Sequence, residues 1–400
     1  MRVLLSTIGS RGDVQPLVAL ALALKQLRCD VRLCVPPDFR DWIEGLGLAV
    51  VPIGPALRGT GKASVTATIT PEQRRAMIEG TVATQFKTIG EAARDRDVII
   101  GATALQIAAP SIAESLGIPY IFAAYCPAVL PSPHHPPPVL AALGDTPAPT
   151  LSDYSALWSD DSRRWNDAWL PLLNAQRAML GLSPVVDVRG HVLTSRPWLA
   201  ADPTLAPWPE SPNMTLVQTG AWILEDERPL APELEAFLDD GDPPVYVGFG
   251  SIRAPEHLIR VMLEAARALG RRVVVLRGWA ELSVGDEPDC IAIGEVNMQK
   301  LFKRVAVVVH HGGAGTTTAA TRAGAPQVVM PQHYDQHYFA RRVEDLGIGA
   351  AHSSRGLDID VVTRELRRAL EPAVAMRAAS IATTVRSDGA AIAAETIQKL

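Results

Sequence analysis

The chain has 400 residues, a length that favours two domains, and its 48% hydrophobic and 20% charged residues are ordinary for a globular protein with a large core. The formal net charge of −5 excludes the basic surface that nucleic acids and anionic membranes require. Four cysteines without a CxxC pair predict reduced thiols in a cytoplasmic protein, and the first residues lack a signal-peptide pattern.

The first half alternates short apolar strands with amphipathic helical windows, the pattern of an α/β domain. We expect strands at residues 2–6, 30–36, 48–53, 97–102 and 118–124, and helices at 14–27 and 38–46. The strands are continuously apolar, which predicts a parallel sheet covered by helices on both faces. The first half is therefore predicted to be one open, doubly wound domain.

The middle of the chain differs in composition. Residues 127–149 are rich in proline and cannot sustain a helix or a central strand, so we expect a functional loop beside the substrate site. Trp158, Trp165 and Trp169 follow in a helical window, where core packing is favoured over ligand stacking because tryptophan buries a large area. The polar, Pro-rich stretch 206–213 has the composition of a linker between domains.

The α/β rhythm restarts after this linker. We expect strands at 245–249, 272–276, 290–294, 306–310, 327–330 and 347–351, helices at 255–269, 316–323 and 338–346, and mostly helix from 359 to 400. The halves share no repeated sequence period, which favours two similar doubly wound domains over a repeat array. The predicted division is a first domain at 1–207, a linker at 208–215 and a second domain at 216–380.

The strongest local motif is HHGGAGTT at residues 310–317, directly after a predicted strand. Glycines allow close backbone approach, and a helix N-terminus binds anions. The ring of His311 and the hydroxyls of Thr316 and Thr317 can donate to phosphate, so we expect a diphosphate site. For a lone glycine-rich turn, a tight βα connection with Thr316 as a plain helix cap is an equal alternative.

Three further polar turns end strands of the same half, namely GFGS at 248–251, GEVNMQ at 294–299 and PQHYDQ at 331–336. Because open α/β sheets bind ligands at the carboxyl ends of their strands, these turns favour a nucleotide pocket over a purely structural turn. Asp335 would repel phosphate but suits sugar hydroxyls, which indicates a nucleotide sugar.

The first domain has its own candidate site in the turn GSRGD at residues 9–13. Its spacing is GxxG, not GxGxxG, and no acidic residue ends the second strand, so NAD binding is disfavoured. Asp13 lies at a predicted helix N-terminus facing the cleft, where it can act as general base for an acceptor hydroxyl. Simple capping of the helix by Asp13 is the alternative.

No metal site is expected. His333 and His337 are four residues apart but lack the flanking acid of a zinc motif, and His134 and His135 have no third ligand.

With these motifs, the chain resembles bacterial family 1 glycosyltransferases of the GT-B type, and most closely those that glycosylate glycopeptide-antibiotic aglycones of the vancomycin type. The likeness runs nearly end to end and includes MRVLLSTIGSRGDVQP, CVPPDF, SPHHPPP, RPWLAADPTLAP, PPVYVGFGS and VVHHGGAGTTTAATRAGAPQVVMPQHYDQ. Sterol glucosyltransferases share RGDVQP and HHGGAGTT, so these two motifs identify only the superfamily. The motifs TGAWIL and GEVNxQxLF have a narrower distribution within it and favour the glycopeptide branch.

The resemblance implies a GT-B fold of two Rossmann-like domains, with the first binding the acceptor, the second the nucleotide sugar, and a helix at 381–400 crossing back onto the first. It implies Asp13 as the catalytic base, Ser10 on the acceptor side, and Arg11 reaching across the cleft toward the donor diphosphate. The implied donor residues are a phosphate cradle of Ser251, His311, Gly313, Gly315, Thr316 and Thr317, a base-binding set of Val296, Met298 and Gln299, and a sugar-binding pair of Asp335 and Gln336. His337 stands where relatives usually have proline.

The implied reaction is one in-line displacement with inversion at the anomeric carbon, without metal or other cofactor. The expected partners are a UDP-sugar or TDP-sugar donor and a natural-product aglycone, with a glycopeptide favoured, and we expect a cytoplasmic monomer. A sterol, lipid or polyketide acceptor is the alternative within the class, and a nucleotide-sugar epimerase is the alternative outside it. Donor turnover without acceptor would distinguish the epimerase.

Overall fold

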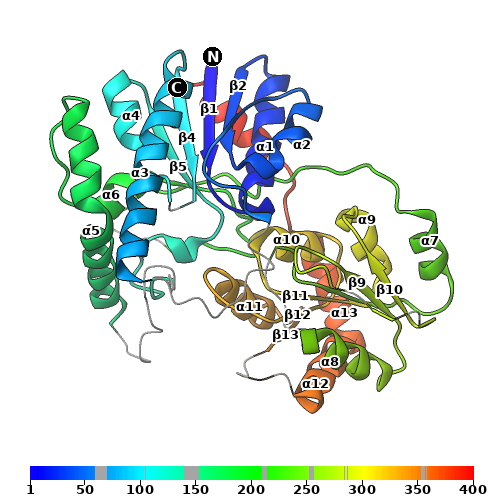
Figure 1. The fold of residues 1–400 in the computed structure, drawn as a ribbon. Coiled ribbons are helices and arrows are strands. Elements are labelled where there is room, and N and C mark those ends of the chain that lie inside the picture. The colour runs from blue at the N-terminus through cyan, green and yellow to red at the C-terminus, as the bar shows by residue number, and fades with distance from the viewer. Residues whose placement is uncertain are drawn as a thin grey trace.

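The computed structural model describes residues 1–58, 70–103, 105–138, 153–209, 214–251, 256–282, 284–285, 287–352, 356 and 358–400. Within them the chain forms two separate parallel β-sheets, each with helices on both faces (Figure 1). The prediction of two doubly wound α/β halves is therefore confirmed.

The first sheet has the strand order β3-β2-β1-β4-β5-β6-β7. Its strands are β1 (Arg2–Thr7), β2 (Asp30–Val35), β3 (Ala49–Pro52), β4 (Val98–Ala102), β5 (Tyr120–Ala124), β6 (Trp198–Leu199) and β7 (Val217–Gln218). One apolar cluster joins this sheet to α1 (Arg11–Gln26), α2 (Arg40–Gly45) and α14 (Gly389–Ile397). A second joins it to α3 (Pro71–Ala93), α4 (Ala109–Leu116), α5 (Tyr154–Met179) and α6 (Val188–Leu193).

The second sheet has the strand order β10-β9-β8-β11-β12-β13. Its strands are β8 (Val245–Gly248), β9 (Val273–Leu276), β10 (Cys290–Ile293), β11 (Val307–His310), β12 (Gln327–Val329) and β13 (Gly349–Ala351). Helices α8 (Glu256–Arg267) and α12 (Ile359–Ala369) share one core with it, while α7 (Pro232–Asp239), α9 (Met298–Leu301) and α10 (Ala314–Arg322) share another. Helices α11 (Gln336–Asp345) and α13 (Pro372–Ala382) complete this half. Among the described residues, 3-10 turns lie at Pro37–Phe39 and Pro127–Val129 in the first half and at Phe302–Arg304 in the second.

Several features of the first half differ from the sequence prediction. Helices α3, α4 and α6 and the two-residue strands β6 and β7 were not predicted. The apolar positions of α3 do not stand out against its alanine, glycine and charged neighbours. Helix α1 begins at Arg11, three residues before its predicted start, so Asp13 lies inside its first turn.

The predicted linker at 208–215 is misplaced. Strand β7 follows it and pairs in parallel with β6 at the edge of the first sheet, so the chain crosses to the second half only after Gln218. A hydrogen bond from Thr215 N–H to the Ser195 carbonyl oxygen (3.0 Å) holds this segment to the first half. Part of the linker, 210–213, lies outside the described residues, as do 139–149 of the Pro-rich segment.

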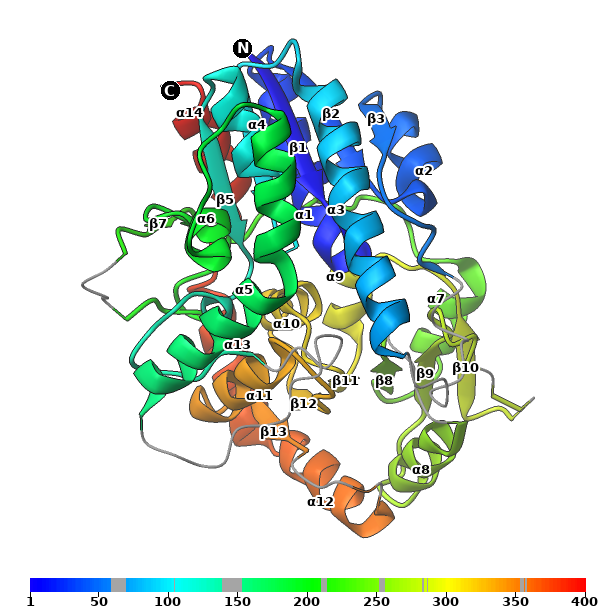
Figure 2. The same cartoon turned by 60° about the vertical axis from the view of Figure 1, so that its left-hand side comes forward.

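The chain returns to the first half after α13, and the last helix, α14, packs against α1 (Figure 2). The buried residues Ala390, Ala393, Ala394 and Ile397 belong to the same core as β1. The two crossing segments touch, since a Cβ atom on Gly389 would lie 2.5 Å from the carbonyl oxygen of Ala221. Only glycine fits this contact.

The remaining expectations on packing can be compared directly. All four cysteines are free and buried. Trp158, Trp165 and Trp169 are 3–5% exposed on α5, as core packing requires. In the part of the chain that the structure describes, no helix is long and apolar enough to cross a membrane.

Candidate active site

Polar turns from both halves meet where the two sheets present the carboxyl ends of their strands. Arg11, after β1, approaches Glu295, after β10, with 3.9 Å between Nη1 and Oε2. Asp335, after β12, lies close enough to Asp13 for the charge of Asp13 to raise its pKa. We call this region the interdomain junction.

Asp13 is held by the turn that precedes it. Its Oδ2 accepts hydrogen bonds from the Ser10 backbone N–H (2.6 Å) and from the Ser10 hydroxyl (3.2 Å). The Tyr125 hydroxyl donates to the Asp13 carbonyl oxygen (3.1 Å) and fixes the backbone from the β5 side. Burial raises the pKa of Asp13 to about 6, although the Ser10 hydrogen bonds act in the opposite direction. Asp13 thus both caps α1 and offers a carboxylate whose pKa suits a general base.

Asp335 is the second carboxyl group of the junction. Burial, and then the charge of Asp13, raise its pKa to about 7, while hydrogen bonds from backbone N–H groups, including that of Ala314, lower it. Ala314 is the first residue of α10. Asp335 therefore lies beside the helix N-terminus that the sequence predicts to bind phosphate.

The glycine-rich turn after β11 has the backbone geometry that its sequence predicts. Gly312 has φ +92°, and a Cβ there would meet the Val329 side chain at 2.7 Å. Gly313 is the N-cap of α10 and has no side chain to satisfy the first amides of the helix. The N–H groups of Gly315 and Thr316 therefore remain for an anion.

His311 lies against this turn. A Cβ on Gly313 would approach its Nε2 to 2.5 Å, so this glycine makes room for the ring, while a Cβ on Gly250 would only contact its Cε1 at 3.7 Å. Its Nδ1 is buried and has no partner among the described residues. Burial, with a smaller effect from His333, lowers its pKa to about 4. His311 is therefore a neutral ring whose unpaired nitrogen suits a phosphate oxygen.

A buried hydrogen-bond network that the sequence analysis missed holds this turn against β12 and α10. The Gly312 N–H donates to His310 Nδ1 (3.0 Å), so His310 Nε2 carries the proton toward Gln327 Oε1 (2.9 Å). Gln327 Nε2 in turn donates to the Thr321 hydroxyl (2.9 Å) on α10. The position of His310 as the first residue of the HHGGAGTT motif was the only sequence signal for this role.

The two predicted threonine donors differ. The Thr317 hydroxyl donates to the Gly313 carbonyl oxygen (2.9 Å) and is buried inside α10, so its proton is directed away from a ligand. Thr316 is half-buried, and the described residues offer its hydroxyl no partner. The geometry thus favours Thr316 over Thr317 as a phosphate donor.

The predicted base-binding residues lie around the start of α9. Val296 and Met298 are half-buried and pack on the core of the second half. The Gln299 amide donates to the Leu224 carbonyl oxygen (2.8 Å) and accepts from the Asp226 N–H (3.4 Å). Gln299 is thus engaged with the segment that follows the first crossing.

Arg11 extends to the second half but pairs there with Glu295, while its guanidinium stacks on Trp42 at 3.6 Å and its Nε donates to Gln15 (3.0 Å). Gln336 is buried, and its Oε1 accepts from the Gln332 and His333 N–H groups (2.8 and 3.2 Å).

Ser251 follows β8 beside Gly250, the glycine that contacts His311, and is half-buried. Within the described ranges no group of three or more His, Cys, Asp or Glu side chains is placed to hold a metal ion.

The fold has well-matched neighbours among solved structures. The chain aligns over its whole length with the glycotransferase of kitacinnamycin (TM-score 0.74, 18% identity, 98% of that chain) and with the glycosyltransferase VinC in complex with DTDP (TM-score 0.65, 22% identity, 98% of that chain). Two separate parallel sheets of Rossmann type, with these structural neighbours, define the GT-B fold.

Sequence comparison identifies the family. Residues 3–132 match the glycosyltransferase family 28 N-terminal domain, and residues 260–399 match the erythromycin biosynthesis protein CIII-like C-terminal domain. Three similar proteins come from Amycolatopsis orientalis: glycosyltransferase GtfE (49% identity over 99% of this chain and 96% of that protein), vancomycin aglycone glucosyltransferase (48%, 98% and 96%) and dTDP-epi-vancosaminyltransferase (40%, 95% and 93%). The chain belongs to this family of glycosyltransferases, which confirms the predicted class of enzyme over an epimerase.

Proposed function

We propose that the enzyme transfers a sugar from a TDP- or UDP-sugar to a hydroxyl of a glycopeptide aglycone, with inversion. The observation that carries the proposal is the juxtaposition of Asp13, a carboxylate with a pKa of about 6, with Asp335 beside the phosphate turn of the other half. The similarity to the vancomycin aglycone glucosyltransferase of A. orientalis supports the acceptor class. Support for TDP comes from the name of the dTDP-epi-vancosaminyltransferase and from the DTDP complex of VinC.

Each half contributes one part of the proposed reaction. Asp13 removes the proton of the acceptor hydroxyl as its oxygen attacks the anomeric carbon, and the bond from that carbon to the diphosphate breaks on the opposite face. Neutral His311, the Thr316 hydroxyl and the first amides of α10 stabilise the negative charge that develops on the leaving diphosphate. Asp335 and the carboxamide nitrogen of Gln336 bind sugar hydroxyls.

We further propose that no metal takes part, because the helix N-terminus and the His311 ring already offer donors to the diphosphate. Transfer should then persist at full rate in excess EDTA. A cytoplasmic monomer remains our expectation, and light scattering tests the oligomeric state.

The experiment is transfer from TDP-glucose or UDP-glucose to vancomycin aglycone, followed by liquid chromatography with mass detection. Asp13→Asn should reduce the transfer rate at least ~100-fold, since a positioned general base contributes about that much. The matched control is Asp41→Asn, an exposed carboxylate on α2 of the same half. Wild-type rates in Asp13→Asn would refute the assignment of the base, and transfer to ergosterol but not to the aglycone would move the acceptor class to sterols.

Donor choice is tested separately by calorimetry with TDP and with UDP. Binding of one nucleotide that is weakened by His311→Ala would support the proposed donor pocket. Equal binding to the variant and the wild type would leave the glycine-rich turn with a structural role only.

A further inference from the structure

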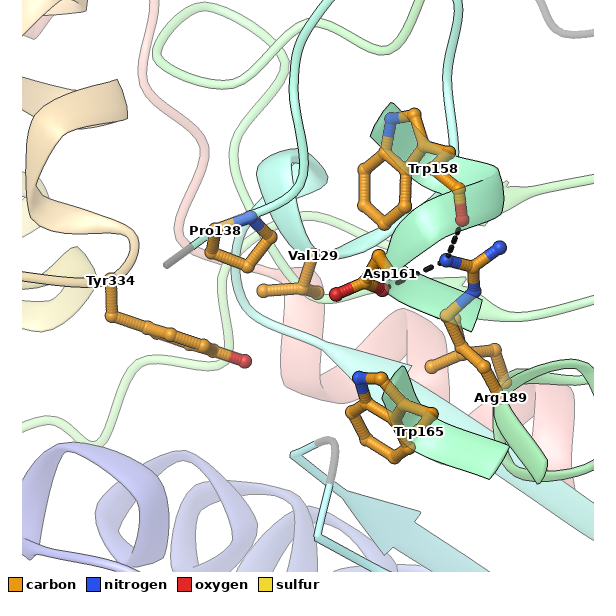
Figure 3. A pocket seen from close by; sticks show the side chains of 8 residues that line it. Val129, Pro138, Trp158, Asp161, Trp165, Arg189 and Tyr334 are labelled. Atoms are coloured by element: carbon orange, nitrogen blue, oxygen red, sulfur yellow. Dashed lines mark hydrogen bonds and ion pairs between the residues drawn. The ribbon is translucent and has the colours of Figure 1, made fainter. Parts of the chain in front are cut away.

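A small pocket lies in the first half and is closed by one residue from the second. Its lining includes Val129, Trp158, Asp161, Trp165 and Arg189 from the first half and Tyr334 from the second (Figure 3). Tyr334 directly precedes Asp335 in the turn after β12. The pocket therefore connects an acceptor-side surface with the loop proposed to bind the donor sugar.

The walls suit an aromatic group with a polar substituent. Trp158, Asp161 and Trp165 are three, four and seven residues apart on α5, so they share one face of the helix, and all are 3–5% exposed. Asp161 pairs with Arg189 at 2.8 Å, and the Arg189 guanidinium lies 5.0 Å from the centre of the Trp158 ring. Two indole rings thus flank an ion pair that can exchange hydrogen bonds with a hydroxyl.

The backbone at Tyr334 is unusual for a bulky residue. Its φ is +58°, in the left-handed region that favours glycine, so tertiary contacts must hold it there. The phenol points from the second half toward Asp161 (Figure 3). Burial raises the pKa of Tyr334, and the charges of Asp335, Asp13 and Asp161 raise it further.

The loop that carries Tyr334 is a compact unit. The Gln336 carboxamide binds the N–H groups of Gln332 and His333, and Asp335 lies beside the Ala314 amide of α10. We expect displacement of the Tyr334 ring to be felt by the two proposed sugar-binding residues that follow it in the same loop.

We propose that this pocket is a subsite for a phenol-type aryl group of the acceptor, and that Tyr334 closes it as an internal plug which such a group displaces. The argument for that occupant is that the Tyr334 phenol lines the pocket and points toward Asp161 and Trp165 (Figure 3). This inference rests on the proposed acceptor transfer, and it makes Tyr334 a specificity-determining residue that couples aryl binding to the sugar loop.

The test is calorimetric titration with p-cresol, with 4-methylcyclohexanol as the non-aromatic probe, and it needs neither donor nor turnover. Tyr334→Ala should bind p-cresol about tenfold more tightly than the wild type, because the plug no longer competes. Tyr334→Phe, which keeps the ring, should bind like the wild type. The matched control is Gln332→Ala in the same loop, where an exposed side chain is lost and the backbone N–H remains.

A pocket-filling variant locates the binding. Val129 is half-buried at the rim, so Val129→Phe in the Tyr334→Ala background should abolish p-cresol binding and leave TDP and UDP binding unchanged as evidence of folding. Equal p-cresol affinity in all variants, or equal affinity for 4-methylcyclohexanol, would overturn the proposal. Loss of sugar transfer with p-cresol binding as expected would instead contradict the proposed function alone.

Discussion

Replacing Ser10 with alanine should move the acid limb of the activity–pH profile to higher pH. The Ser10 hydroxyl donates to Asp13 Oδ2 at 3.2 Å and stabilises its ionised form. Its removal raises the pKa of Asp13 and leaves a smaller fraction of ionised base at any acidic pH. The Ser10 backbone N–H, at 2.6 Å from the same oxygen, is retained in the variant, so Asp13 keeps its position.

The size of the effect follows from the geometry. Hydrogen bonds to charged groups contribute about 1.5–3 kcal/mol, and a contact at the long end of the O–H···O⁻ range contributes less, so we take about 1 kcal/mol. This equals a pKa increase of about 0.7, starting from a value of about 6. Below the limb the ionised fraction falls in proportion, so kcat/KM should fall about fivefold there and change little near pH ~8.

The assay is kcat/KM for sugar transfer across about pH 4.5 to 8.5, since this quantity reports the free enzyme. The matched control is Thr7→Val, at the end of β1 and three residues before Ser10. This change removes a buried hydroxyl that has no partner among the described residues. That variant should leave the limb in place. A uniform loss of rate in Ser10→Ala at every pH, or a wild-type limb near the ordinary aspartate pKa, would refute the reasoning about Asp13.

Three other outcomes are expected. His311→Ala should weaken TDP or UDP binding about tenfold in calorimetry, because one buried hydrogen bond is lost, and unchanged affinity would contradict its phosphate role. Asp335→Asn should raise the melting temperature relative to the wild type by much more at pH ~8 than at pH ~4: the stabilisation by a carboxyl with a raised pKa is complete only below its unfolded pKa of about 4, and it is lost as pH rises from there through about 7. A difference between the two proteins that is constant with pH would argue against a charge effect. Ala394→Asp should lower the free energy of unfolding by ~3 kcal/mol or more, since it buries a charge where α14 meets α1, whereas Ala391→Asp on the exposed face should cost little in urea denaturation.

The sequence predicts those parts of the fold and site that depend on short segments. Buried strands such as β1 and β11 contain unbroken apolar runs, residues 3–5 and 307–309, and Gly312 after β11 is required by its local backbone geometry. The same is true of Asp13, whose hydrogen bonds come from three residues earlier in the chain. Local chemistry of this kind is readable without knowledge of the tertiary contacts.

Features that depend on contacts between distant segments could not be predicted. The edge strand β7 has two residues, and only its pairing with β6 assigns it to the first sheet. Gln299 has the sequence context of a base-binding residue, yet its amide is held by backbone groups about 75 residues away. The position of Tyr334 in a pocket of the other half likewise has no signal in its own loop.

The contact between the two crossing segments has a mechanical consequence. Both ends of the described chain belong to the first half, so the second half is inserted into it. The two chain segments that link the halves are in contact at Gly220 and Gly389. Because these two segments are in contact, we expect any rotation of the second half relative to the first to be centred near them. A methyl group added at Gly389 should push the segments apart and thereby change how the two halves meet at the interdomain junction.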